Sequence, residues 1–284
     1  MRVAGVTRKA LLHPTLGLLA MVAGAAGCAR VPPATSTAAG GDMTSELAPG
    51  EVTVFAASSL TDAFGEIGSA FEQAHPGVTV VFNFAGSPTL RTQIEEGAAA
   101  DVFASANAAE MEALIASGSV DPDVRDFAGN RLAVITAPGS DPPIRNLEDL
   151  ARPGVKIVLA AEEVPVGRYS RQALASLNDA YGTTYADEVL ANVVSLEENA
   201  RLVVAKVALG EADAAIVYAT DAAIKPALGT IAIEDSHNVL ATYPLAVLIG
   251  AARPDLGLAF VDFVLSPEGQ AILGSFGFEP PEGE

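Results

Sequence analysis

Cysteine, histidine and positive charge are all scarce in this chain of 284 residues. The single cysteine, Cys28, cannot form a disulfide within the chain, and the three histidines, His13, His75 and His237, lie far apart in the sequence. No group of Cys, His, Asp and Glu residues has the spacing of a metal site. These absences leave few residues for nucleophilic or metal-assisted catalysis, so we expect neither an enzyme nor a bound cofactor.

The shortage of positive charge excludes two classes of partner. Only 16 Lys and Arg residues stand against 35 Asp and Glu residues, which gives a formal net charge of −19. Nucleic acids and anionic membrane surfaces are bound by basic patches, so we expect neither as a direct partner. The adjacent acids Glu95-Glu96 and Glu162-Glu163 are explained as solvated faces, because neighbours on a helix do not face each other. An anionic ligand would need short-range donors in a sheltered site.

The N-terminal residues have the pattern of an export signal. Basic residues at positions 2, 8 and 9 precede an apolar stretch at residues 16–27, which is shorter than the roughly 20 residues that span a bilayer. The run Ala25-Ala26-Gly27-Cys28 resembles a bacterial lipobox, which implies that Cys28 is lipidated. A leftover cysteine in an ordinary signal peptide is the alternative. We predict a lipoprotein signal peptide over residues 1–28 and an extracytoplasmic protein anchored to the cell membrane.

Residues 29–50 are rich in Pro, Thr, Ser and Gly and contain almost no large apolar side chains. This composition predicts a flexible tether rather than part of a core. About 230 residues follow, which is enough for one large domain or two of modest size. With 50% of the whole chain apolar, the residues for buried cores are available.

Beyond the tether, strand-like segments alternate with segments of helical spacing. Strict alternation of this kind predicts mainly parallel sheets with helices on both faces. We expect strands at Val52–Ala57, Val78–Phe84, Asp101–Ala104, Leu132–Thr136, Lys156–Ala160, Val193–Ser195, Ala214–Tyr218, Thr230–Ile233 and Ala241–Ile249. We expect helices at Thr61–Ala74, Thr89–Glu96, Ala108–Ser117, Leu147–Leu150, Arg168–Leu177, Glu198–Leu209, Pro254–Leu265 and Pro267–Ser275.

The order of these segments predicts an α/β fold with two lobes. We place the first lobe at residues 51–131 and 238–284 and the second at residues 132–237. The chain is expected to return to the first lobe because the last two helices otherwise have no sheet to cover. Two contiguous lobes would give the same local pattern.

Four strand-to-helix turns carry residues suited to an anion. Ser59 is followed three residues later by Asp62, and Ser87 is followed by Pro88; both patterns are also those of ordinary helix N-caps. Gly167 begins a third helix, and a fourth turn combines residues 198–201 with Tyr218. Ligands of α/β proteins gather beyond the carboxyl ends of parallel strands, where helix N-termini present unpaired N–H groups.

Taken together, five ordered runs resemble successive signatures of the periplasmic molybdate-binding protein family of ABC importers. They are VFAASSLTDAF, FAGSPTLRTQIEEGAAADVFASA, VPVGRYSRQAL, AAIVYATDA and EDSHNVLATYPLAVL. The similarity extends from Val52 to Phe278. It implies a type II periplasmic-binding-protein fold with a ligand cleft between the lobes. It also implies molybdate or tungstate as the ligand and the membrane permease of an ABC importer as the partner, and we expect a monomer.

In that family two serine hydroxyls, main-chain N–H groups and a tyrosine hydroxyl hold the oxyanion, with no direct ligand to the metal atom. The resemblance assigns these roles to Ser59, Ser87, Tyr218 and the main chain of Val166 and Ala200. Ser58 offers a second hydroxyl, so the sequence leaves open which of the two serines meets the ligand. Arg168 and Arg201, next to proposed donors, are alternative direct ligands.

A site made only of N–H and O–H donors selects its ligand by protonation state and size. Hydrogen phosphate carries a proton that needs an acceptor, and a mismatched buried polar group costs about 1–3 kcal/mol. Sulfate is smaller than molybdate, so a rigid site leaves it with stretched and weaker hydrogen bonds. Two alternatives remain open: a binding protein for sulfate or a small organic anion, and an enzyme on the same scaffold. A ligand-sensing regulatory domain is disfavoured by the signal peptide and by the lack of a DNA-binding helix pair.

Overall fold

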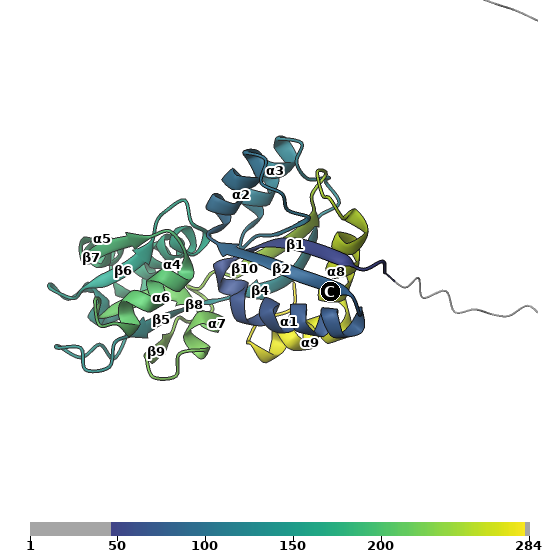
Figure 1. Cartoon of the computed structure of the whole chain (residues 1–284). Helices are drawn as coiled ribbons and strands as arrows, with labels where there is room; N and C mark the ends of the chain where they lie inside the picture. Colours follow the sequence, from purple (N-terminus) through teal and green to yellow (C-terminus); the bar gives the residue numbers. More distant parts are fainter. Residues whose placement is uncertain (1–46, 282–284) are drawn as a thin grey trace, which may run out of the picture. The chain divides into compact units, whose positions relative to one another are not determined.

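The computed structural model describes residues 47–281 (Figure 1). The predicted signal peptide, Cys28 and most of the predicted tether lie outside the described residues. The strands are β1 Gly50–Ala57, β2 Val78–Ala85, β3 Val102–Ala104, β4 Arg125–Asn130, β5 Leu132–Thr136, β6 Ile157–Ala160, β7 Val193–Glu197, β8 Ala214–Tyr218, β9 Gly229–Ala232 and β10 Ala241–Val247. The helices are η1 Ser58–Leu60, α1 Thr61–Ala74, α2 Ser87–Glu95, α3 Ala108–Ala116, η2 Glu148–Ala151, α4 Pro165–Tyr181, α5 Tyr185–Ala191, α6 Ala200–Ala208, α7 Ala219–Ala223, α8 Pro254–Leu265 and α9 Pro267–Ser275.

Two five-stranded sheets organise the described residues. The first has the strand order β2-β1-β3-β10-β4 and the second the order β7-β6-β8-β5-β9. We call the part built on the first sheet lobe 1 and the part built on the second lobe 2. Strand β10, which is last in the sequence, lies between β3 and β4, so the chain leaves lobe 1 after β4 and returns to it after β9.

Each sheet contains one reversed strand. In lobe 1, β10 is antiparallel to both β3 and β4, and in lobe 2, β5 is antiparallel to both β8 and β9. The reversed strands are the ones with which the chain enters each lobe, because an entering strand runs away from the junction while the others run toward it. The prediction of mainly parallel sheets is therefore confirmed, with one exception in each lobe.

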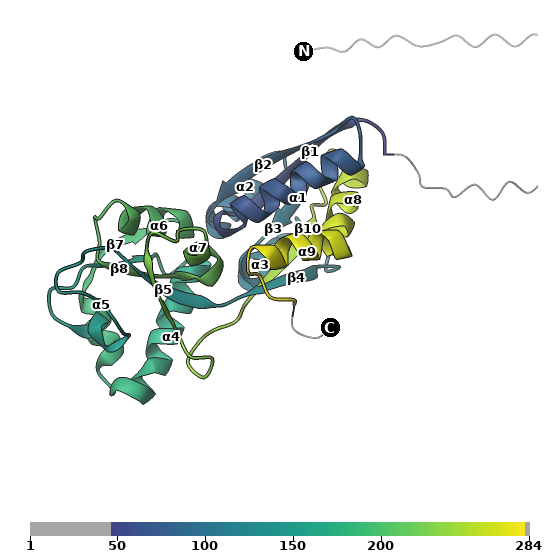
Figure 2. The same cartoon turned by 90° about the horizontal axis from the view of Figure 1, so that it is seen from below.

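Helices cover both faces of each sheet. In lobe 1, α2 and α3 lie on one face and α1, α8 and α9 on the other (Figure 1). The second face buries a cluster of phenylalanines in which Phe64 contacts Phe127 and Phe260, with ring centroids 5.6 Å and 6.0 Å apart. In lobe 2, α4 and α5 lie on one side of the sheet and α6 and α7 on the other (Figure 2).

The two chain crossings between the lobes are joined by one side chain. Asn238, in the returning segment, accepts a hydrogen bond from the Leu132 N–H and donates one to the Leu132 carbonyl, each at 3.0 Å. Arg131 adds ion pairs to Asp235 at 3.6 Å and to Glu279 at 2.9 Å. These contacts hold the two crossing segments side by side, so that they can act together as a hinge between the lobes.

Four elements of the structure were not expected from the sequence, namely η1, β4, α5 and α7. Strand β4 has the sequence RDFAGN, in which charge and glycine hide the strand pattern, and its partner β10 lies more than a hundred residues away. Helix α7 has only five residues. The segment predicted as a helix at 147–150 forms a short 3-10 helix, η2.

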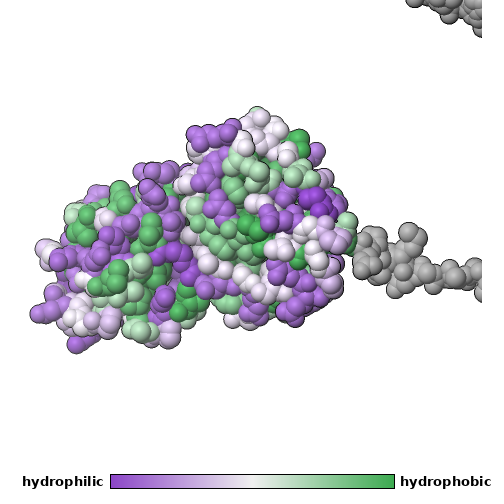
Figure 3. Space-filling view, in the orientation of Figure 1, coloured by the Kyte–Doolittle hydropathy of each residue, from purple (hydrophilic) through white to green (hydrophobic). Residues whose placement is uncertain are grey.

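No single helix among residues 47–281 is long and apolar enough to cross a membrane; only α8 and α9 taken together reach that length, and they are bent by 62°. The face of the molecule seen in Figure 3 mixes hydrophilic and hydrophobic side chains over both lobes. The exposed large apolar residues are likewise spread over several elements, including β7, α6 and α8.

Candidate functional site

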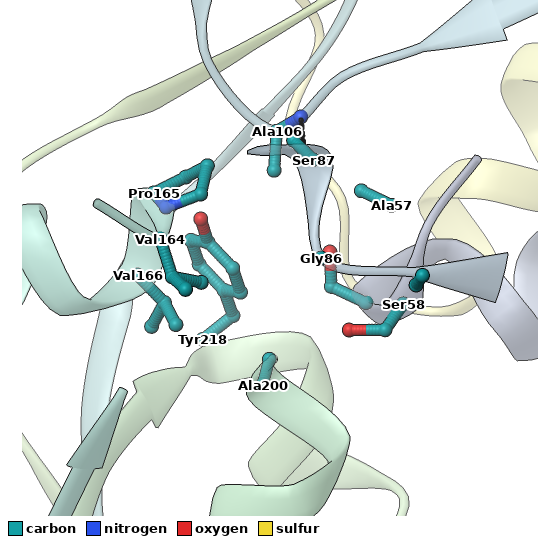
Figure 4. Close-up of a pocket in the computed structure, with 12 residues that line it drawn as sticks. Ala57, Ser58, Gly86, Ser87, Ala106, Val164, Pro165, Val166, Ala200 and Tyr218 are labelled. Carbon is teal, nitrogen blue, oxygen red and sulfur yellow. Dashed lines mark hydrogen bonds between the residues drawn. The ribbon is translucent and has the colours of Figure 1, made fainter. Parts of the chain in front are cut away.

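A small cavity lies between the lobes, where the strands of both sheets end (Figure 4). It encloses about 200 Å³ of space, part of it open to solvent. The part that the centre of a water-sized sphere can reach is about 10 Å³. Sites for drug-sized ligands measure roughly 300–1,000 Å³, so this cavity suits a much smaller species. Its lining contains no charged side chain and consists of Ala57, Ser58, Ser59, Ala85, Gly86, Ser87, Ala106, Val164, Pro165, Val166, Ala200 and Tyr218.

Four helix N-termini meet at this cavity. Helices α1, with the η1 turn before it, and α2 come from lobe 1, whereas α4 and α6 come from lobe 2. The first turn of each helix leaves N–H groups without partners inside the helix and carries a partial positive charge. The cavity is thus surrounded by main-chain donors without any cationic side chain.

Ser58 and Ser59 both line the cavity from η1. The Ser59 hydroxyl lies 3.0 Å from the Tyr243 hydroxyl, on β10. The capping role expected for Ser59 is wrong, because neither η1 nor α1 has a side-chain cap and the residue before α1 is Leu60. The short η1 helix moves the start of α1 two residues beyond Ser59, so neither serine side chain is used as a helix cap.

Ser87 is the first residue of α2 rather than its N-cap, which is Gly86. Its hydroxyl accepts a hydrogen bond from the Ala106 N–H at 3.1 Å, so its own proton remains available for donation. A Cβ atom at Gly86 would lie 2.3 Å from the Glu198 carbonyl oxygen, which belongs to lobe 2. Glycine therefore permits the two lobes to approach at this edge of the cavity.

The Tyr218 side chain occupies the middle of the cavity view, with Val164–Val166 on one side and Ser58 and Gly86 on the other (Figure 4). It is 1% exposed, and its hydroxyl has no hydrogen-bond partner among the described residues. Burial raises the pKa of Tyr218 well above its ordinary value of 10. The group is thus a protonated donor at neutral pH, and a ligand could satisfy it.

Val166 and Ala200 bring main-chain groups to the cavity from the starts of α4 and α6. Pro165 precedes Val166 as the first residue of α4, a position where proline's missing N–H is not needed. A Cβ atom at Gly167 would lie 2.0 Å from the Ala161 carbonyl oxygen, so glycine is required for α4 to pack against the end of β6.

The two arginines considered as alternative ligands do not line the cavity. The Arg201 guanidinium instead contacts Asp62 and the Ser58 carbonyl of lobe 1, and its Nε lies 3.1 Å from Asp221 Oδ1. Asp221 is completely buried, and burial raises its pKa to about 7 although Arg201 opposes this shift.

Among residues 47–281, no three His, Cys, Asp or Glu side chains are grouped so that they could hold a metal ion. Of the histidines, His75 packs against Phe71 with the two rings tilted by 55°, and His237 contacts Ser176; neither lines the cavity. His13 lies outside the described residues.

Sequence reasoning did not single out Tyr243, Asn130 or Asp221. Tyr243 is buried behind Ser59, and Asn130 Nδ2 lies 3.4 Å from its hydroxyl and 2.8 Å from Thr220 Oγ1. A tyrosine within an otherwise apolar strand was the available signal, because a buried hydroxyl needs a partner. The partner itself lies 184 residues away in the sequence, beyond any local pattern.

The chain is similar in sequence and in fold to known binding proteins. A sequence model of the family described as "Bacterial extracellular solute-binding protein" matches residues 52–279. The molybdate-binding protein ModA of Mycobacterium tuberculosis is 36% identical over 262 residues, covering 92% of this chain and 95% of that protein. ModA of Escherichia coli is 35% identical over 238 residues, covering 81% and 89%. The periplasmic molybdate-binding protein of Azotobacter vinelandii matches in structure with a TM-score of 0.71 at 21% identity, covering 81% and 100%.

Proposed function

Since the chain belongs to the bacterial extracellular solute-binding protein family, we propose that it captures molybdate or tungstate and delivers the oxyanion to an ABC importer. Members of this family are extracellular solute-binding proteins, and the similar curated proteins are molybdate-binding proteins. The chain is therefore an extracytoplasmic binding protein and not an enzyme.

The observation that carries the proposal is the unpartnered Tyr218 hydroxyl in a cavity that offers donors and no charged side chain. A buried hydroxyl without a partner costs about 1–3 kcal/mol, which a bound acceptor would recover. All four oxygens of a tetrahedral dianion are hydrogen-bond acceptors, so such an ion matches a cavity lined by donors. Five groups are proposed to hold it: the hydroxyls of Ser59, Ser87 and Tyr218 and the main-chain N–H groups of Val166 and Ala200.

Ser59 is preferred to Ser58 as the ligand-binding hydroxyl. Asn130 Nδ2 is a donor only, so Tyr243 can accept from Asn130 and donate to Ser59. The Ser59 oxygen is then occupied as an acceptor, and its proton is directed to the oxyanion. Ser58 contributes its main chain, whose carbonyl already accepts hydrogen bonds from Thr61 and Arg201.

Neutral donors also favour release. Charge-assisted hydrogen bonds are roughly twice as strong as neutral ones. Helix N-termini stabilise an anion with dipoles that stay in place when it leaves. Ser59 and Ser87 belong to lobe 1, whereas Val166, Ala200 and Tyr218 belong to lobe 2. A permease that separates the lobes would therefore move the two sets of donors apart, so that the anion could no longer contact both. Delivery by lobe opening follows from this division.

The direct test is calorimetric titration of the purified protein with molybdate, tungstate, sulfate and phosphate. We expect one oxyanion per chain, similar affinities for molybdate and tungstate, and phosphate weaker by about tenfold or more because of its unmatched proton. Sulfate binding as tight as molybdate would contradict the size argument. Binding of none of the four would overturn the proposed function.

A further inference from the structure

The Arg201 side chain reaches from lobe 2 to lobe 1. It follows Ala200 at the start of α6, and its Nη2 is paired with Asp62 Oδ2 on α1. Its Nε donates a hydrogen bond of 3.1 Å to the Ser58 carbonyl oxygen. Of the ion pairs among residues 47–281, the Arg201–Asp62 pair alone joins helices of the two lobes beside the cavity; the others lie within a lobe or at the chain crossings.

Asp221 holds the same guanidinium from within lobe 2. Its Oδ1 lies 3.1 Å from Arg201 Nε, and the carboxylate is completely buried. Neither of its oxygens accepts a hydrogen bond from a described residue, so Arg201 is its one counter-charge within that part of the chain. Where Asp221 is ionised, at about pH 7 and above, its buried charge is expensive unless another charge compensates it, which ties the position of Arg201 to that of Asp221.

We propose that Arg201, Asp221 and Asp62 form an ion triad that holds the two lobes closed over the oxyanion. In this triad Asp221 fixes the guanidinium in lobe 2, and Asp62 is its counterpart in lobe 1. Arg201 is a positioning residue and makes no contact with the ligand. The inference rests on the proposed function, because it assigns to the triad the closure step of the same binding site.

The triad is connected to the site through the Ser58 carbonyl. Residues 58–60 form η1, which lines the cavity, so the hydrogen bond from Arg201 also fixes the turn that carries Ser59. Closure and donor orientation therefore depend on one side chain. A ligand that contacts both lobes stabilises the closed form, and the triad stabilises it further, so each favours the other.

Asp62→Asn gives a test in which two explanations predict opposite signs. If Arg201 and its acids act only through their charge, removal of a carboxylate near the site strengthens binding of an anion. If the triad holds the lobes together, the same change weakens molybdate binding, by about threefold, because Asp62 is partly exposed and such pairs are weak. Its side chain is 44% exposed, so the variant is expected to fold.

Arg201→Gln is expected to weaken molybdate binding by about tenfold or more, mainly through faster dissociation. Arg201→Lys keeps the charge but has one nitrogen in place of the separate Nε and Nη2 that reach the partners in the two lobes. We therefore expect its affinity to fall close to that of the Gln variant. The effects of Asp62→Asn and Arg201→Gln on affinity should not add in the double variant, since both substitutions remove the same Arg201–Asp62 contact. The matched control is Arg91→Gln, whose ion pairs with Glu95 and Glu110 lie within lobe 1 and whose loss should leave affinity unchanged.

The separation of the lobes is measured by small-angle scattering of each variant with and without molybdate. We expect a larger radius of gyration for Arg201→Gln than for the wild type or Arg91→Gln in both conditions. Tighter binding by Asp62→Asn, wild-type affinity of Arg201→Lys, or an unchanged radius for Arg201→Gln would overturn the triad. If the wild type binds none of the oxyanions, the proposed function fails, but the ligand-free radius still decides whether the triad holds the lobes together.

Discussion

The Tyr218 side chain is well packed along its ring but lacks a partner at its hydroxyl. Its ring packs against that of Tyr243, with centroids 5.7 Å apart, so the apolar part of the side chain is well accommodated. Its hydroxyl, in contrast, is buried without a partner among the described residues. The side chain therefore costs stability in the free protein and returns it when an acceptor binds.

We predict opposite effects of Tyr218→Phe on stability and on binding. The melting temperature of the free protein should stay the same or rise, because the unpartnered hydroxyl is removed. Molybdate affinity should fall by about 0.5–3 kcal/mol through one lost hydrogen bond. Thermal denaturation with and without molybdate measures both effects. The control is Tyr185→Phe, in which the lost hydroxyl donates to the Leu147 carbonyl at 2.6 Å, so stability should fall while affinity stays constant.

Asp221 gives the protein a pH dependence of known sign. Burial raises its pKa from 3.8 to about 7 in the folded chain. A group with a raised pKa contributes its full stability below the unfolded value and loses that contribution as the pH rises through the folded value. The free energy of unfolding should therefore decline between about pH 4 and 7 because of this carboxyl.

In Asp221→Asn this decline should be absent. The free energy of unfolding is measured with denaturant at about pH 5 and 8. Relative to the wild type, that of Asp221→Asn should increase between these two pH values by up to a few kcal/mol. Asp255→Asn is the matched control, because its exposed carboxyl has a pKa lowered by Arg253 and stays ionised over that range. A difference between Asp221→Asn and the wild type that does not change with pH would refute the assignment.

At the scale of elements, the close approach of the lobes depends on where helix α2 begins. Gly86 immediately precedes that helix and faces the Glu198 carbonyl of the other lobe. Any side chain here meets backbone atoms that cannot move aside without separating the two elements. The helix start thus supplies both donors for the cavity and the space for closure.

Gly86→Ala should hinder closure and weaken molybdate binding by about tenfold or more, with little effect on the stability of the open protein. Calorimetry and small-angle scattering measure the two consequences. Gly65→Ala in α1 is the control, since a Cβ atom there meets nothing within 4 Å and should slightly stabilise the helix. Unchanged affinity in Gly86→Ala would show that the lobes can bind the ligand without this contact.

Elements with strong local signals were predictable from the sequence. Helix α1 spans Thr61–Ala74 as expected, because its apolar residues recur at helical spacing and His75-Pro76-Gly77 ends it. Strands β5 and β8 also have the expected bounds, since LAVIT and AAIVY are short apolar runs between polar segments. The starts of α2 and α4 were placed two or three residues late, because Ser87 and Pro165 lie inside the helices they begin.

The residues proposed for the site were found from ordered motifs, and the five of them line one cavity together with Ser58. Their contacts with one another could not be predicted, because they depend on which turns meet across the lobes. The orientation of Arg201 is the clearest case. Its position next to Ala200 suggested a ligand, but the nearest carboxylates, Asp62 and Asp221, draw the guanidinium away from the cavity.

For the molecule as a whole, the charge of −19 and the neutral cavity have separate effects on binding. The overall field slows the approach of a dianion, whereas the cavity sets how long it stays. Salt screens the long-range field but not contacts inside an enclosed site. We predict that the association rate for molybdate rises with ionic strength in stopped-flow measurements while the dissociation rate changes little. A rate that falls with salt would indicate a basic path to the cavity.

The predicted lipid anchor concerns Cys28, which lies outside the described residues. We propose that this cysteine is lipidated and that the region after it connects the binding domain to the membrane. Palmitate labelling of cells that express the protein should give a labelled band, and Cys28→Ala should abolish it and release the protein from the membrane fraction. Labelling that persists in Cys28→Ala would contradict the lipoprotein assignment.

The position of β10 between β3 and β4 also sets an order of folding. Strand β4 has no other neighbour in its sheet, so lobe 1 stays incomplete until the chain has been made as far as residue 247. All five strands of lobe 2 lie earlier, within residues 132–232, and that lobe can form while the C-terminal part is still being synthesised or exported. The last strand to emerge completes the lobe that began first.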